Sequence, residues 1–399
     1  MAKTEYEKKL GLYFHIPFCL SKCAYCDFNS APCADHEIIS KYIDAMIAHM
    51  SSYKKAAEEY DVDTIFIGGG TPTSIPINEL VRLIKAIKSN FNVEKEAEFT
   101  VESNPATVDK SSLVKLRKHG VNRLSIGLQT ADENELKILS RTHSRKDFYK
   151  SFRLAREAKF DNINVDLMFG IPIQTHSSLM HTLRYVMSLG PEHISLYDLK
   201  IEPGTRFYDN YEEIRPYLPD EDTDVKMYLD SVKLLQDNGY LQYEISNFSR
   251  PGKMCAHNLR YWNCDEYLGF GVSAHSYFEN NRFSIIPDRD MYIEAMLNPL
   301  SKIRAIENLE EVEERERMGE YIMLRLRLSD GIDLKEFERR FGYSFEELYG
   351  QKCMRFLRSG HMRIKAGKLS LSPSGMFISN YIISDILEFE DFGKYYFGS

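Results

Sequence analysis

The feature that most constrains the fold is the regular alternation of strand-like and helix-like segments from the start of the chain to about residue 245. Six short runs rich in β-branched and aromatic residues predict strands, at Leu12–Ile16, Thr64–Ile67, Glu98–Glu102, Arg123–Leu128, Ile163–Met168 and His193–Leu199. The stretches between them have the apolar spacing of amphipathic helices, at Ile38–Tyr60, Asn78–Phe91, Ser111–His119, Lys146–Phe160 and Leu179–Leu189. Because parallel strands need a crossover connection, usually a helix, this order predicts a parallel sheet with helices outside it. A further helix over Asp224–Asp237 and a strand over Leu241–Ile245 add a partial unit, so we expect an α/β fold built as an open, incomplete (β/α)6 barrel.

A second part of different character begins near Asn280, where the alternation stops. Charged helical patterns, a short hairpin-like stretch and a closing helix follow, at Leu309–Leu328, Leu334–Phe341, Phe345–Leu357, Met362–Leu371 and Gly375–Leu387. The sequence therefore predicts two domains. Residues 1–280 form the partial barrel, and residues 281–399 form a smaller, mostly α-helical domain with a β-wing.

Composition narrows the class of protein. The chain of 399 residues has a net charge of −8 and is 43% hydrophobic and 28% charged, as folded globular proteins are. It has no block of basic residues, so we expect no nucleic-acid partner. The polar opening MAKTEYEKKL is unlike a secretion signal, and no apolar run approaches the roughly 18 residues of a membrane-spanning helix. We therefore expect a cytoplasmic protein with at most peripheral membrane contact.

Polar and glycine-rich segments follow the predicted strands, at the end of the sheet where barrels and open parallel sheets place their chemistry. Gly68-Gly69-Gly70-Thr71 follows the second strand, and its backbone can approach a ligand closely because no Cβ is in the way. The run matches neither a phosphate-binding loop nor a dinucleotide fingerprint. Glu102, Gln129, Arg141 and Asp166 lie at or beyond the ends of later strands, and each of them taken alone is more often a surface residue or a helix cap than part of a binding site.

Three of the seven cysteines, Cys19, Cys23 and Cys26, fall within eight residues directly after the first strand. In a reducing compartment such a cluster indicates metal binding or catalysis before it indicates disulfides. Three thiolates on one loop can hold three irons of a [4Fe–4S] cluster and leave the fourth iron open for an external ligand. A zinc site that lacks a ligand and a set of reactive thiols remain alternatives.

The motifs around these residues resemble those of a known superfamily. The cysteine spacing, Tyr25 before the third cysteine and the GGGT run are similar to the radical S-adenosylmethionine (SAM) superfamily. Within it, the segments HIPFC, YCDF, GGGTPT, GLQ after the fourth strand, Arg141-Thr142-His143 and DLMFGIP from Asp166 resemble one branch. That branch holds the oxygen-independent coproporphyrinogen dehydrogenases and their relatives, the heme chaperones. The resemblance extends from about Tyr13 into the C-terminal domain.

The resemblance implies a cofactor pair and the residues that hold it. Cys19, Cys23 and Cys26 would bind a [4Fe–4S] cluster, and its open iron would bind the amino and carboxylate groups of SAM. The cofactor-binding positions implied are Tyr13, Gly69, Gly70, Thr71, Glu102, Gln129, Arg141 and Asp166. These residue types suit the task, since arginine pairs bidentately with a carboxylate and carboxylates accept hydrogen bonds from amine and hydroxyl groups. An electron donor to the cluster is also implied.

Two departures from the dehydrogenase pattern point to the chaperones. The dehydrogenases have a fourth cysteine two residues after the third, where this chain has Phe28, and they begin with an extension, whereas here the first strand starts near Leu12. The segment His257-Asn258-Leu259-Arg260-Tyr261-Trp262 matches the HNxxYW signature of the heme chaperones. Imidazole commonly ligates heme iron, so we expect His257 to bind heme and to face a cleft between the domains. Cys255 and His275 are alternative ligands.

The sequence thus predicts a heme chaperone that binds heme and transfers it to apoproteins, using a [4Fe–4S] cluster and SAM. A coproporphyrinogen dehydrogenase is the first alternative, and a heme-storage or sensor protein with a structural cluster is the second. The resemblance leaves a homodimer open.

Overall fold

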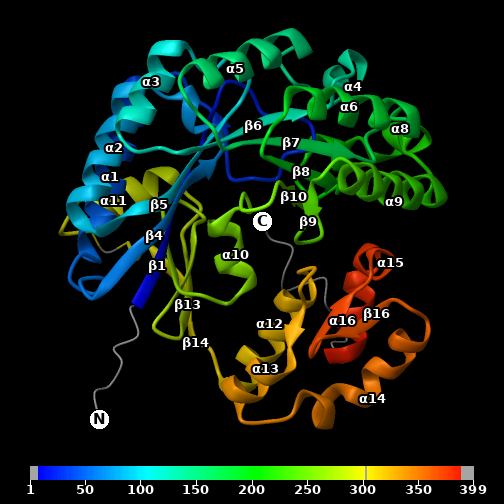
Figure 1. The fold of residues 1–399 in the computed structure, drawn as a ribbon. Helices are drawn as coiled ribbons and strands as arrows, with labels where there is room; N and C mark the ends of the chain where they lie inside the picture. The colour runs from blue at the N-terminus through cyan, green and yellow to red at the C-terminus, as the bar shows by residue number, and fades with distance from the viewer. Residues whose placement is uncertain (1–7, 302, 388–399) are drawn as a thin grey trace.

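The computed structural model describes residues 8–301 and 303–387 (Figure 1). A twelve-stranded sheet has the strand order β14-β13-β12-β11-β1-β4-β5-β6-β7-β8-β10-β9. Six neighbouring strands of this sheet are mutually parallel and correspond to the six predicted strands, except that the last one ends before Leu199: β1 (Lys8–Ile16), β4 (Tyr60–Gly69), β5 (Asn92–Ser103), β6 (Arg123–Gln129), β7 (Ile163–Phe169) and β8 (His193–Asp198). β14 and β9 do not pair with each other, so the barrel is open, as the sequence predicted.

Helices between the parallel strands cover the outer face of the sheet (Figure 1). They are α1 (His36–Ser52), α2 (Ile77–Asn90), α3 (Lys110–Lys118), α4 (Glu133–Ile138), α5 (Arg145–Glu157), α6 (His176–Leu189) and, after β8, α9 (Glu221–Asp237). Capping boxes at Asp109, Ser144 and Thr175 begin α3, α5 and α6, because each side chain accepts a hydrogen bond from an otherwise unpaired backbone N–H. Short elements complete this part, at β2 (Phe18–Cys19), β3 (Ala31–Pro32), η1 (Pro72–Ser74), α7 (Arg206–Asp209), α8 (Tyr211–Ile214) and η2 (Arg215–Tyr217).

The predicted helix over Ile38–Tyr60 is too long, since α1 ends at Ser52 and Tyr60 is the first residue of β4. Tyr53 caps the helix and its ring stacks on Phe283 at an interplanar angle of 8°. Contact with a residue far along the chain therefore overrides the local helical pattern.

Residues 241–311 add strands at both edges of the parallel sheet. β9 (Leu241–Gln242) and β10 (Asn247–Ser249) follow β8, and α10 (Ala256–Trp262) leads to the other edge. There β11 (Tyr267–Phe270) pairs in parallel with β1, and β12 (His275–Phe278), β13 (Asn281–Ile285) and β14 (Ile306–Glu311) follow antiparallel, with α11 (Arg289–Leu297) between the last two. This meander was not predicted from the sequence, because its strands are short and mixed in character.

The predicted helix over Leu309–Leu328 is wrong in its first turn, because Leu309 belongs to β14 and the helix α12 (Glu314–Leu326) begins at Glu314. Pairing with β13 overrides the helical propensity of this glutamate-rich segment. The sheet also continues past residue 280, where the sequence analysis placed the domain boundary. We propose that the boundary lies near Val312, where the large sheet ends.

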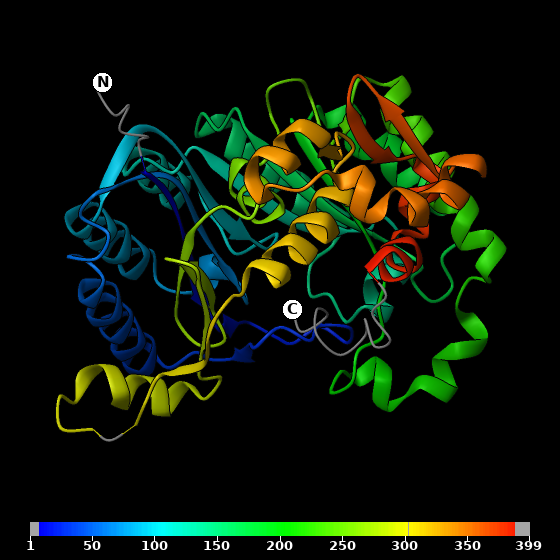
Figure 2. The same cartoon turned by 90° about the horizontal axis from the view of Figure 1, so that it is seen from below.

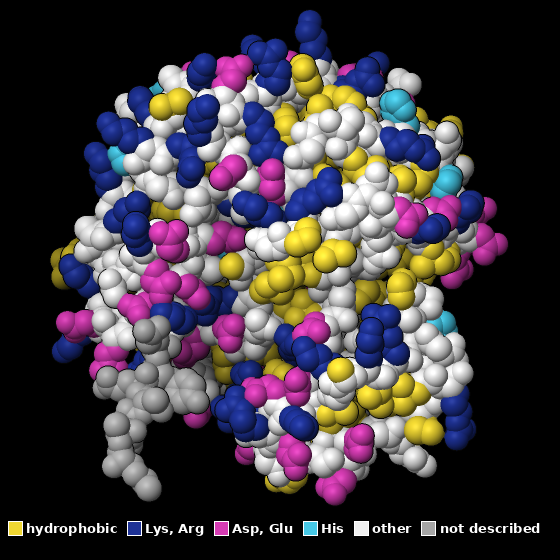
Figure 3. Space-filling model, viewed as in Figure 1, with side chains coloured by type: hydrophobic (Ala, Val, Ile, Leu, Met, Phe, Trp, Pro, Cys, Tyr) yellow, Lys and Arg dark blue, Asp and Glu magenta, His cyan; other side chains and the backbone are white. Residues whose placement is uncertain are grey.

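The C-terminal part is mostly helical and carries a small sheet. Its elements are α12, β15 (Ile332–Asp333), α13 (Leu334–Phe341), α14 (Phe345–Arg358), β16 (Met362–Lys365), β17 (Lys368–Leu371), α15 (Pro373–Phe377) and α16 (Ser379–Leu387). Strands β15, β17 and β16 form the predicted β-wing, and the predicted closing helix is divided into α15 and α16. This part packs against α9 and α10, whereas α11 lies beside α1 at the other end of the molecule (Figures 1 and 2). Hydrophobic side chains gather where the two parts meet, and charges of both signs are mixed over the same face (Figure 3).

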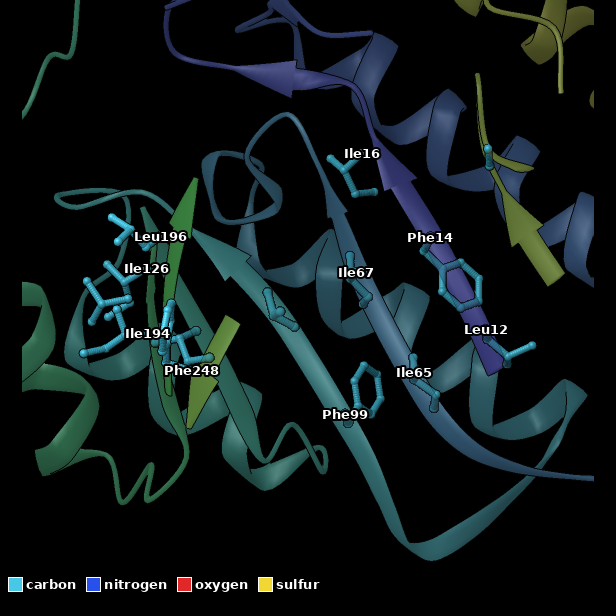
Figure 4. Close-up of a cluster of buried hydrophobic side chains, with 14 of the residues drawn as sticks. Leu12, Phe14, Ile16, Ile65, Ile67, Phe99, Ile126, Ile194, Leu196 and Phe248 are labelled. Atoms are coloured by element: carbon cyan, nitrogen blue, oxygen red, sulfur yellow. The ribbon is translucent and has the colours of Figure 1, made fainter. Parts of the chain in front are cut away.

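Alternation along the parallel strands separates an apolar outer layer from a polar interior. Side chains that pack toward the helices are buried and apolar: Leu12, Phe14, Ile16, Ile65, Ile67, Phe99, Ile126, Ile194, Leu196 and, from β10, Phe248 (Figure 4). The alternate positions face the opposite way. They include Glu98, Thr100 and Glu102 on β5, Arg123 and Ser125 on β6, Asn164 and Asp166 on β7, and His193 and Ser195 on β8. The barrel interior is therefore lined with groups that can bind a polar ligand or one another.

Candidate cluster and cofactor site

A cavity of about 470 Å³ opens at the carboxyl ends of the parallel strands. It brings together the three predicted cluster ligands and seven of the eight predicted cofactor positions: Cys19, Cys23, Cys26, Gly69, Gly70, Thr71, Glu102, Gln129, Arg141 and Asp166. Residues more than 140 positions apart in sequence meet here because the parallel strands all end at the same edge. Tyr13 is the one predicted position that does not line the cavity.

The loop that carries the three cysteines is held by backbone hydrogen bonds at several points. β2 and β3 pair in parallel and close the loop, and the Ala24 amide donates to the Leu139 carbonyl at 3.1 Å. The Cys19 thiol lies 3.6 Å from the Thr71 hydroxyl, and Arg141 Nη1 donates to Cys23 Sγ at 3.4 Å. Burial raises the pKa of the Cys19 and Cys26 thiols, and a bound metal would lower it by stabilising the thiolates.

All three cysteines line the cavity. In the described part of the chain, no three His, Cys, Asp or Glu side chains are placed to hold a single metal ion. A [4Fe–4S] cluster takes one thiolate per iron, so separate thiols around a cavity fit a cluster better than they fit one zinc ion. The residues present therefore fit the cluster that the sequence predicted.

The glycine run begins in the last two residues of β4, and Gly70 lies against the cysteine loop. A Cβ at Gly70 would lie 2.8 Å from the Phe18 carbonyl oxygen and 2.9 Å from Cys19 Sγ, so only glycine fits there. The amides of Gly70 and Thr71 donate to the carbonyls of Ile16 and Phe18, each at 2.8 Å. The run thus fixes the loop while exposing backbone to the cavity.

Two carboxyl groups, Glu102 and Asp166, face the cavity from β5 and β7. The Gly69 amide donates to Glu102 Oε2 at 3.2 Å. Exclusion of water by the surrounding protein raises the pKa of Glu102 to about 8, and the nearby Asp166 charge adds to the rise. Asp166 accepts hydrogen bonds of 2.8 Å from both Ser125 Oγ and Asn164 Nδ2. Burial raises its pKa as well, and these hydrogen bonds oppose that rise.

Arg141 has a buried N–H group that could bind a ligand, and Gln129 has an unusual backbone conformation at the cavity. Arg141 Nη2 donates to Asn104 Oδ1 at 2.5 Å and to the Gly127 carbonyl at 2.7 Å, whereas its buried Nε has no hydrogen-bond partner among the residues that the structure describes. Since native proteins rarely leave such a group unpaired, this N–H fits a hydrogen bond to a bound carboxylate. Gln129 adopts φ +71°, a strained conformation for a residue other than glycine, beside a bulge between β6 and β7.

Tyr13 and His257 lie inside the barrel rather than at the cavity. Tyr13 Oη bonds to His15 Nδ1 at 3.1 Å. His257 on α10 is 1% exposed, with Nδ1 bonded to Thr64 Oγ1 at 3.0 Å and Nε2 bonded to Tyr261 Oη at 2.7 Å. Its ring stacks on Phe66 with centroids 5.4 Å apart. The expectation that the imidazole faces a cleft between the domains is therefore wrong for this arrangement, because α10 packs His257 against β4.

The alternative heme ligands differ from His257 in their surroundings. Cys255 is fully buried, and its thiol donates to Glu98 Oε1 at 3.3 Å. His275 is exposed on β12. Ligation of heme by His257 stays a prediction, and it needs α10 to move.

Three polar residues that organise the site, Asn104, Ser125 and Asn164, were given no specific role by the sequence-based predictions. Asn104 holds Arg141, while Ser125 and Asn164 hold Asp166. A period-two pattern could have found Asn164, because it alternates with Asp166 in a strand whose other residues are apolar.

An open (β/α) barrel with three clustered cysteines at the carboxyl ends of its strands is the architecture of radical SAM proteins. The model of the radical SAM superfamily matches residues 13–186, and that of the HemN C-terminal domain matches residues 312–378. The fold is also similar to that of the Escherichia coli coproporphyrinogen III oxidase HemN. That comparison has a TM-score of 0.83 and 22% identity and covers 96% of this chain and 91% of the enzyme.

Comparison with curated relatives shows to which family of the superfamily the chain belongs. The chain is 35% identical to the heme chaperone HemW of Bacillus subtilis, over 94% of this chain and 98% of the relative. It is 32% identical to HemW of Lactococcus lactis (96% and 98%) and 34% identical to HemW of Escherichia coli (82% and 85%). The chain therefore belongs to the HemW family. Across residues 8–301 and 303–387, no helix has the length and apolar character needed to span a membrane.

Proposed function

We propose that this protein is a heme chaperone, which binds heme and transfers it to recipient apoproteins with the help of a [4Fe–4S] cluster and SAM. The observation that carries the proposal is the similarity to the Bacillus subtilis protein named heme chaperone HemW. The match covers 94% of this chain and 98% of the relative. A match of that extent includes both the barrel and the C-terminal part, so it concerns the whole protein. A cytoplasmic site of action and an electron donor to the cluster belong to the same proposal.

The proposed cofactor site assigns a role to each group around the cavity. Cys19, Cys23 and Cys26 would each bind one iron. Arg141, with its unpaired Nε, would bind the carboxylate of SAM, and the backbone at Gly69 and Gly70 would approach its amine. Glu102, Gln129 and Asp166 would accept or donate hydrogen bonds to the remaining polar groups, and Thr71 would hold Cys19 in place. When bound and reduced by its electron donor, the cluster would supply one electron for the reductive cleavage of SAM.

Tyr13 has a supporting role in this proposal. Its ring lies under the cavity against Phe66, with centroids 6.2 Å apart, and its hydroxyl orients His15. His15 Nε2 in turn bonds to the Asn29 carbonyl at 2.8 Å, within the segment that returns from the cysteine loop. Tyr13 would therefore stabilise the loop rather than touch the cofactor.

The test begins with protein reconstituted anaerobically with iron and sulfide, then titrated with heme and assayed with coproporphyrinogen. We expect a Soret band that saturates with heme, transfer of that heme to an apoprotein of the heme-dependent class, and no formation of protoporphyrinogen. Formation of protoporphyrinogen would show that the protein is a coproporphyrinogen dehydrogenase. Heme binding without any transfer would favour a storage or sensor protein.

A matched pair of variants tests the ligand. His257→Ala should shift or abolish the Soret band, while His275→Ala, which changes an exposed histidine, should leave it as in the wild type. Iron content should be the same in both variants, because neither residue lies on the cysteine loop. If His257→Ala gave the wild-type spectrum, the heme ligand would have to be another residue.

A further inference from the structure

A continuous chain of buried hydrogen bonds crosses the barrel interior from α10 to the cofactor cavity. The Cys255 amide, just before α10, bonds to Tyr243 Oη at 3.4 Å, and that hydroxyl bonds to His193 Nε2 at 2.8 Å. His193 Nδ1 bonds to Asn164 Oδ1 at 2.6 Å, and Asn164 Nδ2 donates to Asp166 Oδ1 at 2.8 Å. Asp166 lines the cavity. We call these groups the Tyr243–His193–Asn164 chain.

The two ends of the chain set the direction of every hydrogen bond in it. The Asn164 amide oxygen can only accept, so His193 carries its proton on Nδ1 and donates to Asn164 Oδ1, while the Asn164 N–H groups donate to Asp166. In a neutral imidazole Nε2 then accepts, so Tyr243 Oη donates to His193 Nε2 and accepts from the Cys255 amide. Burial holds the pKa of His193 well below its usual range, so the ring is neutral and this tautomer is fixed. Asp166 is thus oriented by groups that are themselves oriented from α10.

The electrostatic surroundings of two charged groups, Glu98 and Arg123, depend on the position of α10. Glu98 accepts hydrogen bonds from the amides of Ala256 and His257, both at 3.0 Å, and from the Cys255 thiol. Arg123 is 2% exposed and interacts electrostatically with both Glu98 and Asp166, while its Nε has no hydrogen-bond partner within the described part of the chain. If α10 left its place, Glu98 would lose three donors, and the buried cation would be drawn toward it and away from Asp166.

The position of His257 requires such a departure if it is to bind a metal. Both ring nitrogens are engaged, and the side chain is 1% exposed between α10 and β4. An imidazole in this place has no free nitrogen for an iron. Two states therefore follow for α10: a docked state, with His257 buried and Asp166 oriented, and an undocked state, with His257 free and the Tyr243–His193–Asn164 chain open at one end.

We infer that the Tyr243–His193–Asn164 chain couples the two sites, with His193 and Asn164 as positioning residues for Asp166, so that SAM in the cavity favours docked α10 and weakens heme binding at His257. This inference rests on the proposed function and on His257 as the ligand. Coupling of this kind is reciprocal, so heme must weaken SAM binding by the same factor. The arrangement would let the cofactor promote the release of heme.

The test measures heme affinity from the Soret band of anaerobic, reconstituted protein, without SAM and with saturating SAM. In the wild type we expect SAM to raise the heme Kd at least about fivefold, the lower end of ordinary coupling between two sites. Tyr243→Phe removes only the hydroxyl that joins Cys255 to His193, and it should bring this ratio to within about twofold of unity. Tyr240→Phe is the matched control, because its buried hydroxyl donates to the Pro191 carbonyl at 2.8 Å and lies outside the chain. It should keep the wild-type ratio.

A second measurement needs no variant. Hydrogen exchange at the amides of Cys255, Ala256 and His257 should slow when SAM is added, because docked α10 becomes more populated.

Each outcome bears on one proposal or the other. A wild type that binds heme with the same affinity with and without SAM, or a Tyr243→Phe variant that keeps the full ratio, overturns the coupling and leaves the chaperone proposal in place. Unchanged exchange at the three amides overturns it as well. A wild type that binds no heme overturns the chaperone proposal, and the coupling falls with it.

Discussion

Replacing Glu102 by glutamine should change how the stability of the protein depends on pH. The carboxyl group is enclosed by protein beside Asp166, which raises its pKa from 4.5 to about 8. Folding therefore takes up a proton at this site at any pH between these values. Because the folded state then binds more protons than the unfolded state, the free energy of unfolding falls as the pH rises from about 4.5 to about 8 and levels off above. The amide introduced by Glu102→Gln would keep an acceptor for the Gly69 N–H without titrating.

The magnitude follows from the pKa of about 8. At about 1.4 kcal/mol per fully bound proton and pH unit, the wild type should lose about 2 kcal/mol between about pH 6 and about pH 8 through this group. Groups that do not interact with Glu102 titrate alike in both proteins and cancel in the difference. The free energy of unfolding of Glu102→Gln, relative to wild type, should therefore rise by about 2 kcal/mol over that range.

Urea unfolding of the cluster-free, reduced protein, followed by circular dichroism at several pH values, measures this difference. Glu244→Gln serves as a comparison, because burial raises the pKa of Glu244 to about 7, so its effect should level off about one pH unit earlier. The free energies of unfolding of Glu102→Gln and wild type could instead differ by the same amount at about pH 6 and about pH 8. Glu102 would then not titrate between these pH values. The account of the carboxyl pair at the cavity would then be refuted.

Three further predictions concern the same site. Cys23→Ala should lose almost all of the roughly four irons of the reconstituted protein in an iron assay, whereas Cys353→Ala, a buried cysteine of α14, should keep them; equal iron in both would refute the cluster assignment. Asp166→Ala should weaken SAM binding by about 1.5–3 kcal/mol in calorimetry, since a hydrogen bond to a charged group is lost, and wild-type affinity would count against the proposed pocket. Arg123→Met should lower the free energy of unfolding by about 3–5 kcal/mol in urea titrations, because Glu98 and Asp166 lose the cation buried between them; a change below about 1 kcal/mol would show that this charge is not needed.

The sequence alone was enough for the parallel strands and for much of the cavity. Alternating strands and helices leave few arrangements, because each parallel pair needs a crossover and the crossovers share one hand. Once the strands are parallel, their carboxyl ends meet, so Cys19, Gly70, Glu102 and Asp166 must lie at one edge. The cysteine spacing is local, since eight residues on one loop keep three thiols close wherever the loop lies.

Pairings between distant segments were beyond the sequence. Nothing in Tyr267–Phe270 indicates that β11 joins the sheet beside β1, and nothing in Ile306–Glu311 indicates a strand rather than the start of a helix. Period-two alternation shows which side chains share a face of a strand, yet it does not say which strand lies beside it.

His257 shows the difference most clearly. Its motif was visible in the sequence, and a histidine between two domains was expected to face a cleft. The tertiary structure instead packs α10 against β4, so that Thr64 and Tyr261 occupy both ring nitrogens. Residues 193 positions apart make the first of these contacts, and such contacts depend on how whole elements pack to bury their apolar faces. The sequence determined which chemical groups the protein possesses. The packing of its elements decided which of these groups line the cavity and which are buried with their hydrogen bonds satisfied.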